Sequence, residues 1–262
     1  MAHDAFRKAL TQVYFDDPCQ VLPNPLWQSL EGVDRYETAL TSGNRGFSRL
    51  EAWEDNHLYI YWRREERQPS MLINRRLEFQ QSAVIHQDFL NPPTVAGFDR
   101  FASFYRLIHR GAPVSTTALP AGYRFAGVVD SQDEIQAVIA HIEQNDPSDQ
   151  LAAFHDWLNR PTFTPDLWLW VMGEAADQPV GLGVGEIDTE HREAAILWVQ
   201  VQSDDRNKGI GRAIVHELLH RIGNRAQFTT VSGPVEDRTN PGAFFRQCGF
   251  TGDDVWWVLE RE

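Results

Sequence analysis

The residues whose types and spacing could do chemistry lie between an apolar stretch that ends at Val201 and a periodic stretch that begins at Ala213. Between them runs a basic loop that contains two glycines, Arg206-Asn207-Lys208-Gly209-Ile210-Gly211-Arg212. Glycine lets the backbone approach a bulky anion, and the first amides of a helix have no intrahelical acceptor. Together with the positive end of the helix dipole, such a loop favours a phosphate or diphosphate group.

Two widespread phosphate-binding motifs do not match this loop. The sequence contains neither G-x-x-x-x-G-K-[ST] nor a G-x-G-x-x-G that opens the first strand of a dinucleotide-binding fold. The loop therefore belongs to neither of these classes.

Local patterns predict the elements that must position the loop. Apolar residues recur at helical spacing between Ala213 and Ile222, and Ser131 with Glu134 resembles a capping box. From Tyr123 onward the predicted order is strand, two helices, three strands, helix, strand, short helix and strand. The strands are expected at 123–129, 167–172, 180–186, 194–201, 228–231 and 255–259, and the helices at 131–142, 147–158, 209–223 and 241–247.

This arrangement resembles the GCN5-related N-acetyltransferases (GNAT superfamily). Arg206-Asn207-Lys208-Gly209-Ile210-Gly211 matches the acetyl-coenzyme A loop of that family, R/Q-x-x-G-x-G/A, and it lies between a strand and a helix as in the family. Downstream, Asn240-Pro241-Gly242-Ala243-Phe244-Phe245-Arg246-Gln247-Cys248-Gly249-Phe250 is similar to the family's second motif. The resemblance covers residues 123–262. It implies an α/β (α+β) fold with a mixed, mostly antiparallel sheet, a splayed strand pair and flanking helices, next to a smaller α+β N-terminal domain.

The resemblance also implies where acetyl-CoA would bind. Its pantetheine arm would pair with the main chain of Val199, Gln200 and Val201. Its pyrophosphate would meet the backbone amides of Arg206, Asn207, Lys208, Gly209, Ile210, Gly211 and Arg212. Asn240 is a further pantetheine contact in this scheme, and its alternative role is that of a helix N-cap before a proline at the first helical position.

The reaction implied is attack of a neutral amine on the thioester. An alkyl amine is mostly protonated at pH 7, so a base must take a proton. Ala195 occupies the position where some members place a glutamate, and the two candidate bases are Glu186 and Glu193; in the alternative, both are strand-end carboxylates in solvent. His191, in the turn between them, is expected to be exposed.

Two further roles belong to the tetrahedral intermediate and the leaving group. The amide of Val199 could donate to the oxyanion. The position of the tyrosine that usually protonates the thiolate holds Phe245, which cannot donate a proton.

Residues 1–122 contain no motif. We expect helices near 6–14, 25–40 and 98–109 and a hairpin of 50–54 with 58–62. Length and element order allow this half to be a degenerate copy of the acetyltransferase fold, and the segment 111–121 is the expected boundary between a domain at 1–122 and one at 123–262.

Charge and cysteine content limit the class of partner and the compartment. The net charge is −13, and residues 123–262 carry the excess, with 11 basic against 23 acidic side chains. This disfavours nucleic acid and anionic membranes as partners. No apolar segment is long enough to span a membrane and no metal-binding pattern is visible, and Cys19 and Cys248 are expected to be buried or reduced thiols. We infer a cytoplasmic protein without a metal cofactor.

Two functions fit these observations. The first is an N-acetyltransferase that moves acetyl from acetyl-CoA to a primary amine of a small molecule or of a peptide or protein N-terminus. The second is a catalytically silent acyl-CoA-binding or regulatory module, in which the first half mediates formation of a homodimer.

Overall fold

The computed structural model divides the chain into two compact units. Unit 1 comprises Met1–Ile108 together with Ser232–Glu262, and unit 2 comprises His109–Val231. The residues that the structure describes are 2–64, 77–78, 80–90, 95, 97–111, 114, 116–126, 158–175, 177–237 and 239–262.

Unit 2 is built on a mixed sheet with the strand order β10-β9-β8-β7-β6. All neighbours in it are antiparallel except β9 and β10, which run parallel. Its elements are β6 (Tyr123–Phe125), β7 (Phe163–Gly173), β8 (Gln178–Asp188), β9 (Glu193–Val201), η2 (Ser203–Asp205), α8 (Ile210–Ile222), η3 (Gly223–Arg225) and β10 (Phe228–Pro234), whose last three residues belong to unit 1.

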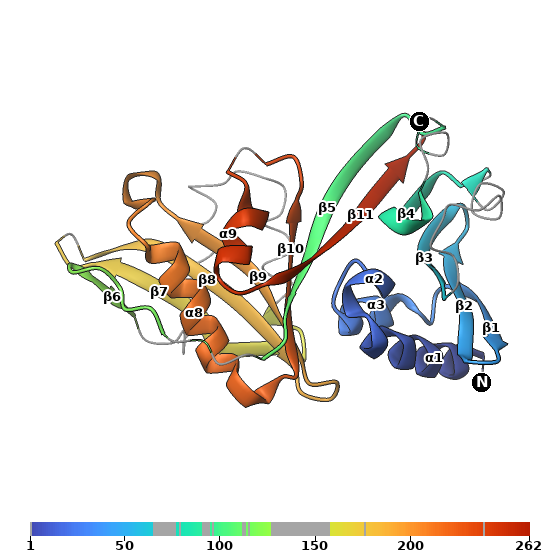
Figure 1. Cartoon of the computed structure of the whole chain (residues 1–262), viewed down its shortest axis with the longest axis horizontal. Coiled ribbons are helices and arrows are strands. Elements are labelled where there is room, and N and C mark those ends of the chain that lie inside the picture. Colours follow the sequence, from blue (N-terminus) through green and yellow to red (C-terminus); the bar gives the residue numbers. More distant parts are fainter. Residues whose placement is uncertain are drawn as a thin grey trace. The chain divides into compact units, whose positions relative to one another are not determined.

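Helix α8 packs closely on one face of this sheet, and Figure 1 shows it lying across the strands. The close approach is possible because β8 presents glycines to the helix. A Cβ on Gly181 would meet Ile210 and Ile214, and one on Gly183 would meet Ile214 and Leu218. The opposite face of the sheet carries a hydrophobic cluster formed by Trp168, Trp170, Leu182 and Val184.

Unit 1 has the strand order β1-β2-β3-β4-β11-β5. Only β3 and β4 are parallel, and β11, from the end of the chain, pairs with both β4 and β5. Figure 1 shows β11 running alongside β5. The elements are α1 (Ala2–Asp16), α2 (Pro18–Val21), α3 (Leu26–Gly32), β1 (Glu37–Gly43), β2 (Gly46–Glu54), β3 (His57–Arg63), β4 (Ser82–His86), η1 (Gln87–Phe89), β5 (Arg100–His109), α9 (Pro241–Gln247) and β11 (Thr251–Glu260).

These observations confirm the predicted fold class of a mixed, mostly antiparallel sheet with helices. The first helix, the hairpin now labelled β2 and β3, the strands β7 to β11 and helices α8 and α9 occur where the sequence predicts them. Two predictions in the first half are wrong. The helix expected at 98–109 is strand β5, and the helix expected at 25–40 ends at Gly32, after which a turn leads into β1.

Several predictions fall outside the described residues: the end of the strand expected at 123–129 and nearly all of the two helices expected at 131–142 and 147–158. The two compact units also divide the chain differently from the predicted domains, because residues 232–262 group with the first half. Compact units and family domains are different divisions, so the boundary at 122 stays a prediction.

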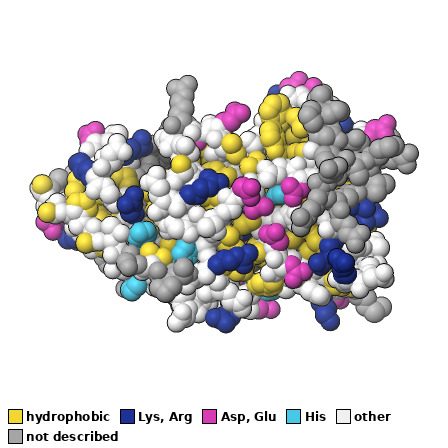
Figure 2. Space-filling view, viewed as in Figure 1, with side chains coloured by type: hydrophobic (Ala, Val, Ile, Leu, Met, Phe, Trp, Pro, Cys, Tyr) yellow, Lys and Arg dark blue, Asp and Glu magenta, His cyan; other side chains and the backbone are white. Residues whose placement is uncertain are grey.

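Cys19 and Cys248 are buried and form no disulfide, as expected. No helix in the described part of the chain is long and apolar enough to cross a membrane. On the face shown in Figure 2, basic and acidic side chains are interspersed in small groups.

Candidate functional site

The pairing of β9 with β10 ends halfway along β9. It runs from Phe228 opposite Glu193 to Val231 opposite Ile196, whereas β9 continues to Val201. The first four residues of β9 are buried and the last five are only partly buried. Strand β10 therefore leaves the edge of β9 uncovered beyond Ile196.

A β-bulge accounts for this separation. Val184 lies opposite Trp198 and Gly185 lies opposite Ile196, so Leu197 is an extra residue in β9. A bulge bends its strand and increases the local twist. Because the extra residue directly follows the last residue paired with β10, the bulge turns the rest of β9 away from its parallel neighbour.

Strand β9 leads through η2 into the loop predicted to bind a diphosphate. Asn207 and Gly209 have positive φ angles, 61° and 91°, which turn the chain sharply before α8 begins. The helix has no side-chain cap, and the amide of Ala213 donates to the carbonyl of Gly209 at 3.1 Å. The amides of Ile210 and Gly211 precede that bond, so they lie where a helix offers no internal acceptor. The turn thus has the geometry of an anion site.

Lys208 belongs to a hydrogen-bonded trio with Asp205 and Tyr123. Its ammonium donates to the Asp205 carboxylate at 2.7 Å and to the Tyr123 hydroxyl at 2.9 Å, and that hydroxyl donates to the same carboxylate at 2.6 Å. The bonds from Lys208 and Tyr123 lower the pKa of Asp205, and the bond to Asp205 raises the pKa of Lys208. Both groups are therefore charged at neutral pH and largely compensate each other.

The remaining basic side chains of the loop differ in their surroundings. Arg206 turns back toward β9, where its Nε donates to the carbonyl of Val201 at 3.0 Å. Arg212 is exposed on the first turn of α8. On β9, Gln200 accepts a hydrogen bond from the indole of Trp198 at 3.2 Å. The side-chain oxygen of Gln200 is thus occupied within β9 itself.

Glu186 is fully buried, which overturns the alternative that it is a solvent-exposed carboxylate. Its Oε2 accepts a hydrogen bond from the Thr162 hydroxyl at 3.1 Å and lies 3.8 Å from the guanidinium of Arg160. The carboxylate therefore has a hydroxyl donor and a guanidinium beside it.

Glu193 is also fully buried, so the solvent-exposed alternative is wrong for it too. It lies at the start of β9, opposite Asp188 of β8 and Phe228 of β10. Because Glu186 lies opposite Ala195, two residues beyond Glu193, the two glutamates project from the same face of the sheet. That face is opposite to the one covered by α8.

His191, expected to be exposed, is only 18% exposed at its side chain. Its Nδ1 lies 2.6 Å from Oδ2 of Asp188. The other carboxylate oxygen of Asp188 accepts from the amides of Glu190 and His191. Asp188 therefore fixes the turn between β8 and β9, and the sequence analysis did not identify this role.

The second motif forms α9, which belongs to unit 1. Asn240 caps the helix, since its side chain accepts from the amide of Ala243 at 3.3 Å and Pro241 follows at the first helical position. This confirms the capping role, and the pantetheine contact of Asn240 stays a prediction. Phe245 is buried, with edge contacts to Phe244 and Phe250. It fills a core position, and its own side chain carries no proton to donate.

Comparison with known proteins agrees with this arrangement. Residues 132–250 match the model of the acetyltransferase (GNAT) family. A comparison with curated proteins finds no significant match.

Solved structures with a similar fold extend over nearly the whole chain. A GCN5-related N-acetyltransferase from Sphaerobacter thermophilus is 17% identical, with a TM-score of 0.61 over 90% of this chain and 85% of that chain. A GNAT-family acetyltransferase from Colwellia psychrerythraea is 13% identical, with a TM-score of 0.60 over 97% of both chains. A tandem GNAT protein from the clavulanic acid biosynthesis pathway is 12% identical, with a TM-score of 0.56 over 98% of this chain and 95% of that chain. Residues 132–250 therefore match an acetyltransferase (GNAT) domain, and the chain has the fold of GNAT-family acetyltransferases.

Proposed function

We propose that the protein transfers the acetyl group of acetyl-CoA to a primary amine of a small molecule or of a peptide or protein N-terminus. The observation that supports this most directly is the combination of two features at β9. The parallel pairing with β10 stops at the bulge, and the strand then leads into the start of α8, whose first backbone amides have no acceptor within the helix and can bind an anion. A long substrate with an amide-containing arm and a diphosphate needs both features side by side.

In this proposal the substrate is recognised mainly by backbone. The amides and carbonyls of Val199, Gln200 and Val201 pair with the pantetheine arm. The turn amides between Arg206 and Arg212 receive the diphosphate. Asn240 is a further contact to the arm.

The chemistry then follows from the groups near β8 and β9. The neutral amine attacks the thioester carbonyl, a C–N bond forms, and the C–S bond breaks as the CoA thiolate leaves. The amide of Val199 stabilises the oxyanion. Glu186 or Glu193 accepts the proton that the amine loses. Because both carboxylates are buried, a water molecule carries this proton from the amine to the carboxylate. Phe245 cannot protonate the thiolate, so this proton comes from another group or from water, or the thiolate leaves unprotonated.

The same phenylalanine favours a second candidate function, a catalytically silent acyl-CoA-binding module. Release of free CoA thiol on a panel of amines separates the two functions. A silent module is stabilised against heat by acetyl-CoA without releasing thiol. Cys19 and Cys248 form no disulfide, which is typical of a reducing compartment, and we propose a cytoplasmic location on that ground.

The test of the binding site is Gly211→Glu, measured by isothermal titration calorimetry with acetyl-CoA. The new carboxylate would occupy the place of the diphosphate and repel it, so we expect no detectable binding. A glutamate in the first turn also suits the helix dipole, so folding should be preserved. The matched control is His220→Glu, which adds the same side chain to the last turn of α8 and should leave the affinity unchanged. Unchanged affinity in Gly211→Glu would refute this position for the diphosphate.

A further inference from the structure

Unit 1 repeats the strand separation found in unit 2. In the pairing of β2 with β3, Ala52 lies opposite Ile60 and Trp53 lies opposite Leu58, so Tyr59 is an extra residue in β3. This bulge has the same effect as the one at Leu197, because it bends the strand next to its parallel neighbour.

The parallel pairing stops at this bulge as well. Strand β3 pairs with β4 from His57 opposite Ser82 to Leu58 opposite Ala83, and β3 then continues to Arg63. The last paired residue of β3 directly precedes its bulge, as it does in β9. The separation therefore recurs in a second place on the chain with the same local cause.

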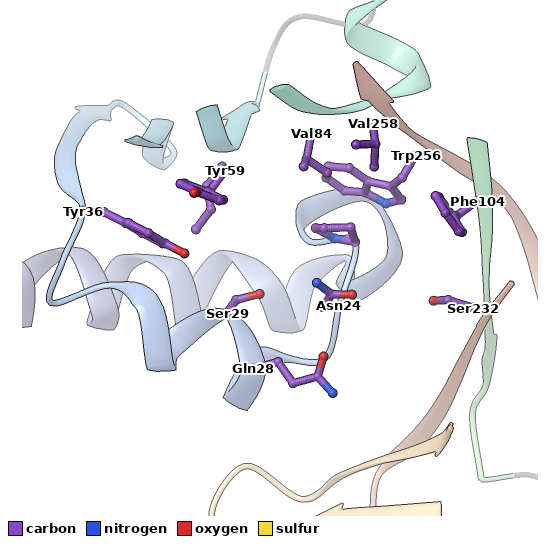
Figure 3. A pocket seen from close by; sticks show the side chains of 12 residues that line it. Asn24, Gln28, Ser29, Tyr36, Tyr59, Val84, Phe104, Ser232, Trp256 and Val258 are labelled. Atoms are coloured by element: carbon purple, nitrogen blue, oxygen red, sulfur yellow. The ribbon is translucent and has the colours of Figure 1, made fainter. Parts of the chain in front are cut away.

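A cavity of about 290 Å³ lies at this second separation, and Figure 3 shows its lining. The bulged Tyr59 and its neighbour Ile60 contribute from β3, and Val84 contributes from β4. Trp256 of β11 and Phe104 of β5 complete the apolar part. All of its lining residues belong to unit 1.

The aromatic rings of the cavity are held in place by contacts with one another and with neighbouring backbone. Tyr36 stacks on Tyr59 with a centroid distance of 4.6 Å and an angle of 10° between the rings. The indole of Trp256 donates to the carbonyl of Cys19 at 2.8 Å, so its polar atom is satisfied. Gly32 allows the Tyr36 ring to lie against α3, because a Cβ there would collide with the Tyr36 hydroxyl.

The polar groups of the cavity are uncharged. Asn24, Gln28 and Ser29 line it from one side and Ser232 from another, as Figure 3 shows. Among the described residues that line it, no side chain is ionic, and burial raises the pKa of Tyr59, which therefore stays a neutral phenol. A charged ligand would lose its hydration there without gaining a counter-ion.

The connection that follows β3 does not contain the sequence pattern of the loop proposed to bind a diphosphate in unit 2. The sequence 64–76, which joins β3 to the segment before β4, contains no glycine and so no Arg-x-x-Gly-x-Gly pattern. The cavity has nearly twice the volume of one of roughly 150 Å³ that holds benzene, so an aromatic ring with a polar substituent fits its size.

We propose that this cavity binds a small, uncharged molecule that combines a flat aromatic ring with an amide or hydroxyl group. The ring lies against the aromatic side chains Tyr36, Tyr59 and Trp256, and the polar group bonds with the amides and hydroxyls of Asn24, Gln28, Ser29 or Ser232. The cavity shares no residue with the proposed acetyl-CoA site, and its assignment does not depend on that proposal.

The experiment uses the full chain and three probes of the same shape: benzamide, benzoate and benzylammonium, with binding measured by ligand-observed NMR titration. We expect benzamide to bind and both ions to bind at least about tenfold more weakly, because the cavity offers them no counter-ion. Equal or tighter binding of either ion would overturn the assignment of an uncharged ligand.

Two variants locate the binding. Ser29→Phe fills the cavity from a partly buried helix position and should abolish benzamide binding, and Gly32→Ala displaces the Tyr36 ring and should weaken it severalfold. The matched control is Phe101→Ala, which removes an exposed ring from β5 outside the cavity and should leave the affinity unchanged. Benzamide binding that survives in a folded Ser29→Phe protein, or that acetyl-CoA displaces, would overturn the proposal.

Discussion

At the scale of single residues, the structure changes the expected role of Lys208. The only lysine of residues 123–262 was expected to add positive charge to the loop, yet it is paired with Asp205, whose carboxylate lies beside the same turn. At the proposed site, the carboxylate would therefore oppose diphosphate binding while it holds the ammonium in place.

We predict that Asp205→Asn increases the affinity for acetyl-CoA. The substitution removes one negative charge next to the turn and keeps a hydrogen-bond acceptor for Lys208. An exposed charge pair of this kind changes affinity by about two- to fivefold, and the effect should shrink at high salt. Calorimetry at low and high ionic strength measures both. Lys208→Ala is the paired control, for which we expect a modest loss, and weaker binding in Asp205→Asn would contradict this account of the trio.

The choice between the two buried glutamates is a second prediction at this scale. Glutamine has nearly the same shape as glutamate but cannot accept a proton. We therefore expect one of the variants Glu186→Gln and Glu193→Gln to lose about 10²- to 10⁴-fold in turnover, together with the acidic limb of the pH profile, because a general base is inactivated when it is protonated at low pH. The other variant should keep its profile. Profiles that are unchanged in both would eliminate both candidates, and thermal unfolding of each variant shows whether a loss is due to misfolding.

At the scale of elements, the position of the loop depends on how closely α8 lies on the sheet. Gly183 faces the helix, and a Cβ there would collide with Ile214 and touch Leu218. We predict that Gly183→Ala destabilises the fold by about 1–3 kcal/mol, because the tightly packed helix must move outward. Urea unfolding measures this free energy. Displacement of α8 also shifts the turn at its start, so the affinity for acetyl-CoA should fall.

Gly181→Ala is the matched control for this prediction. A Cβ on Gly181 would approach Ile214 at 3.1 Å and Ile210 at 3.3 Å, contacts that small side-chain movements can relieve. We expect a clearly smaller loss of stability than in Gly183→Ala. An equal loss in both variants would mean that Gly183 does not determine the distance between α8 and the sheet.

The elements that the sequence predicts correctly are those determined by local pattern. The strand and helix on either side of the loop have clear periodicity, and their chemistry lies in consecutive residues. Strand β5 was predicted as a helix because Phe101, Tyr105 and Ile108 recur at helical spacing. Its strand conformation is imposed by pairing with β11, more than 140 residues away, which no local pattern reveals.

The candidate site is divided in the same way. The loop residues are contiguous and could be found, whereas Tyr123 joins Asp205 and Lys208 only through the fold. Burial of Glu186 and Glu193 could not be inferred either, because both lie at strand ends in the sequence. The bulges at Tyr59 and Leu197 depend on registers between strands, and no residue type marks them.

At the scale of the whole molecule, one buried histidine links stability to pH. Burial, and then the neighbouring His216, lower the pKa of His109. In the unfolded chain a histidine has an ordinary pKa near 6.5, so between that value and the folded pKa the unfolded state binds more protons. We therefore predict that stability falls as the pH drops below about 6.5 and levels off below the folded pKa.

The measurement is urea unfolding at several pH values between 8 and 5. The variant His109→Gln removes the titrating ring and should flatten the dependence in this range. The carboxylates with lowered pKa values, Asp4, Asp205 and Asp237, have ordinary values near 3.8 and act only at lower pH. If the free energy of unfolding depends on pH in the same way in His109→Gln, the dependence comes from other groups.

The path of the chain leads to the last prediction. Strand β11 lies between β4 and β5, so the sheet of unit 1 is complete only when the final residues of the chain have been added. Removal of residues 251–262 would expose one edge each of β4 and β5. It would also remove Trp256 and so uncover the core residues that contact it, among them His86.

We predict that the truncated chain loses the structure of unit 1, and that a fragment of residues 1–122 does not fold alone. Limited proteolysis and circular dichroism test both, with the full chain as the reference. A fragment 1–122 that unfolds cooperatively would show that the first half is an independent domain, and would remove the structural reason for treating the two ends of the chain as one folding unit.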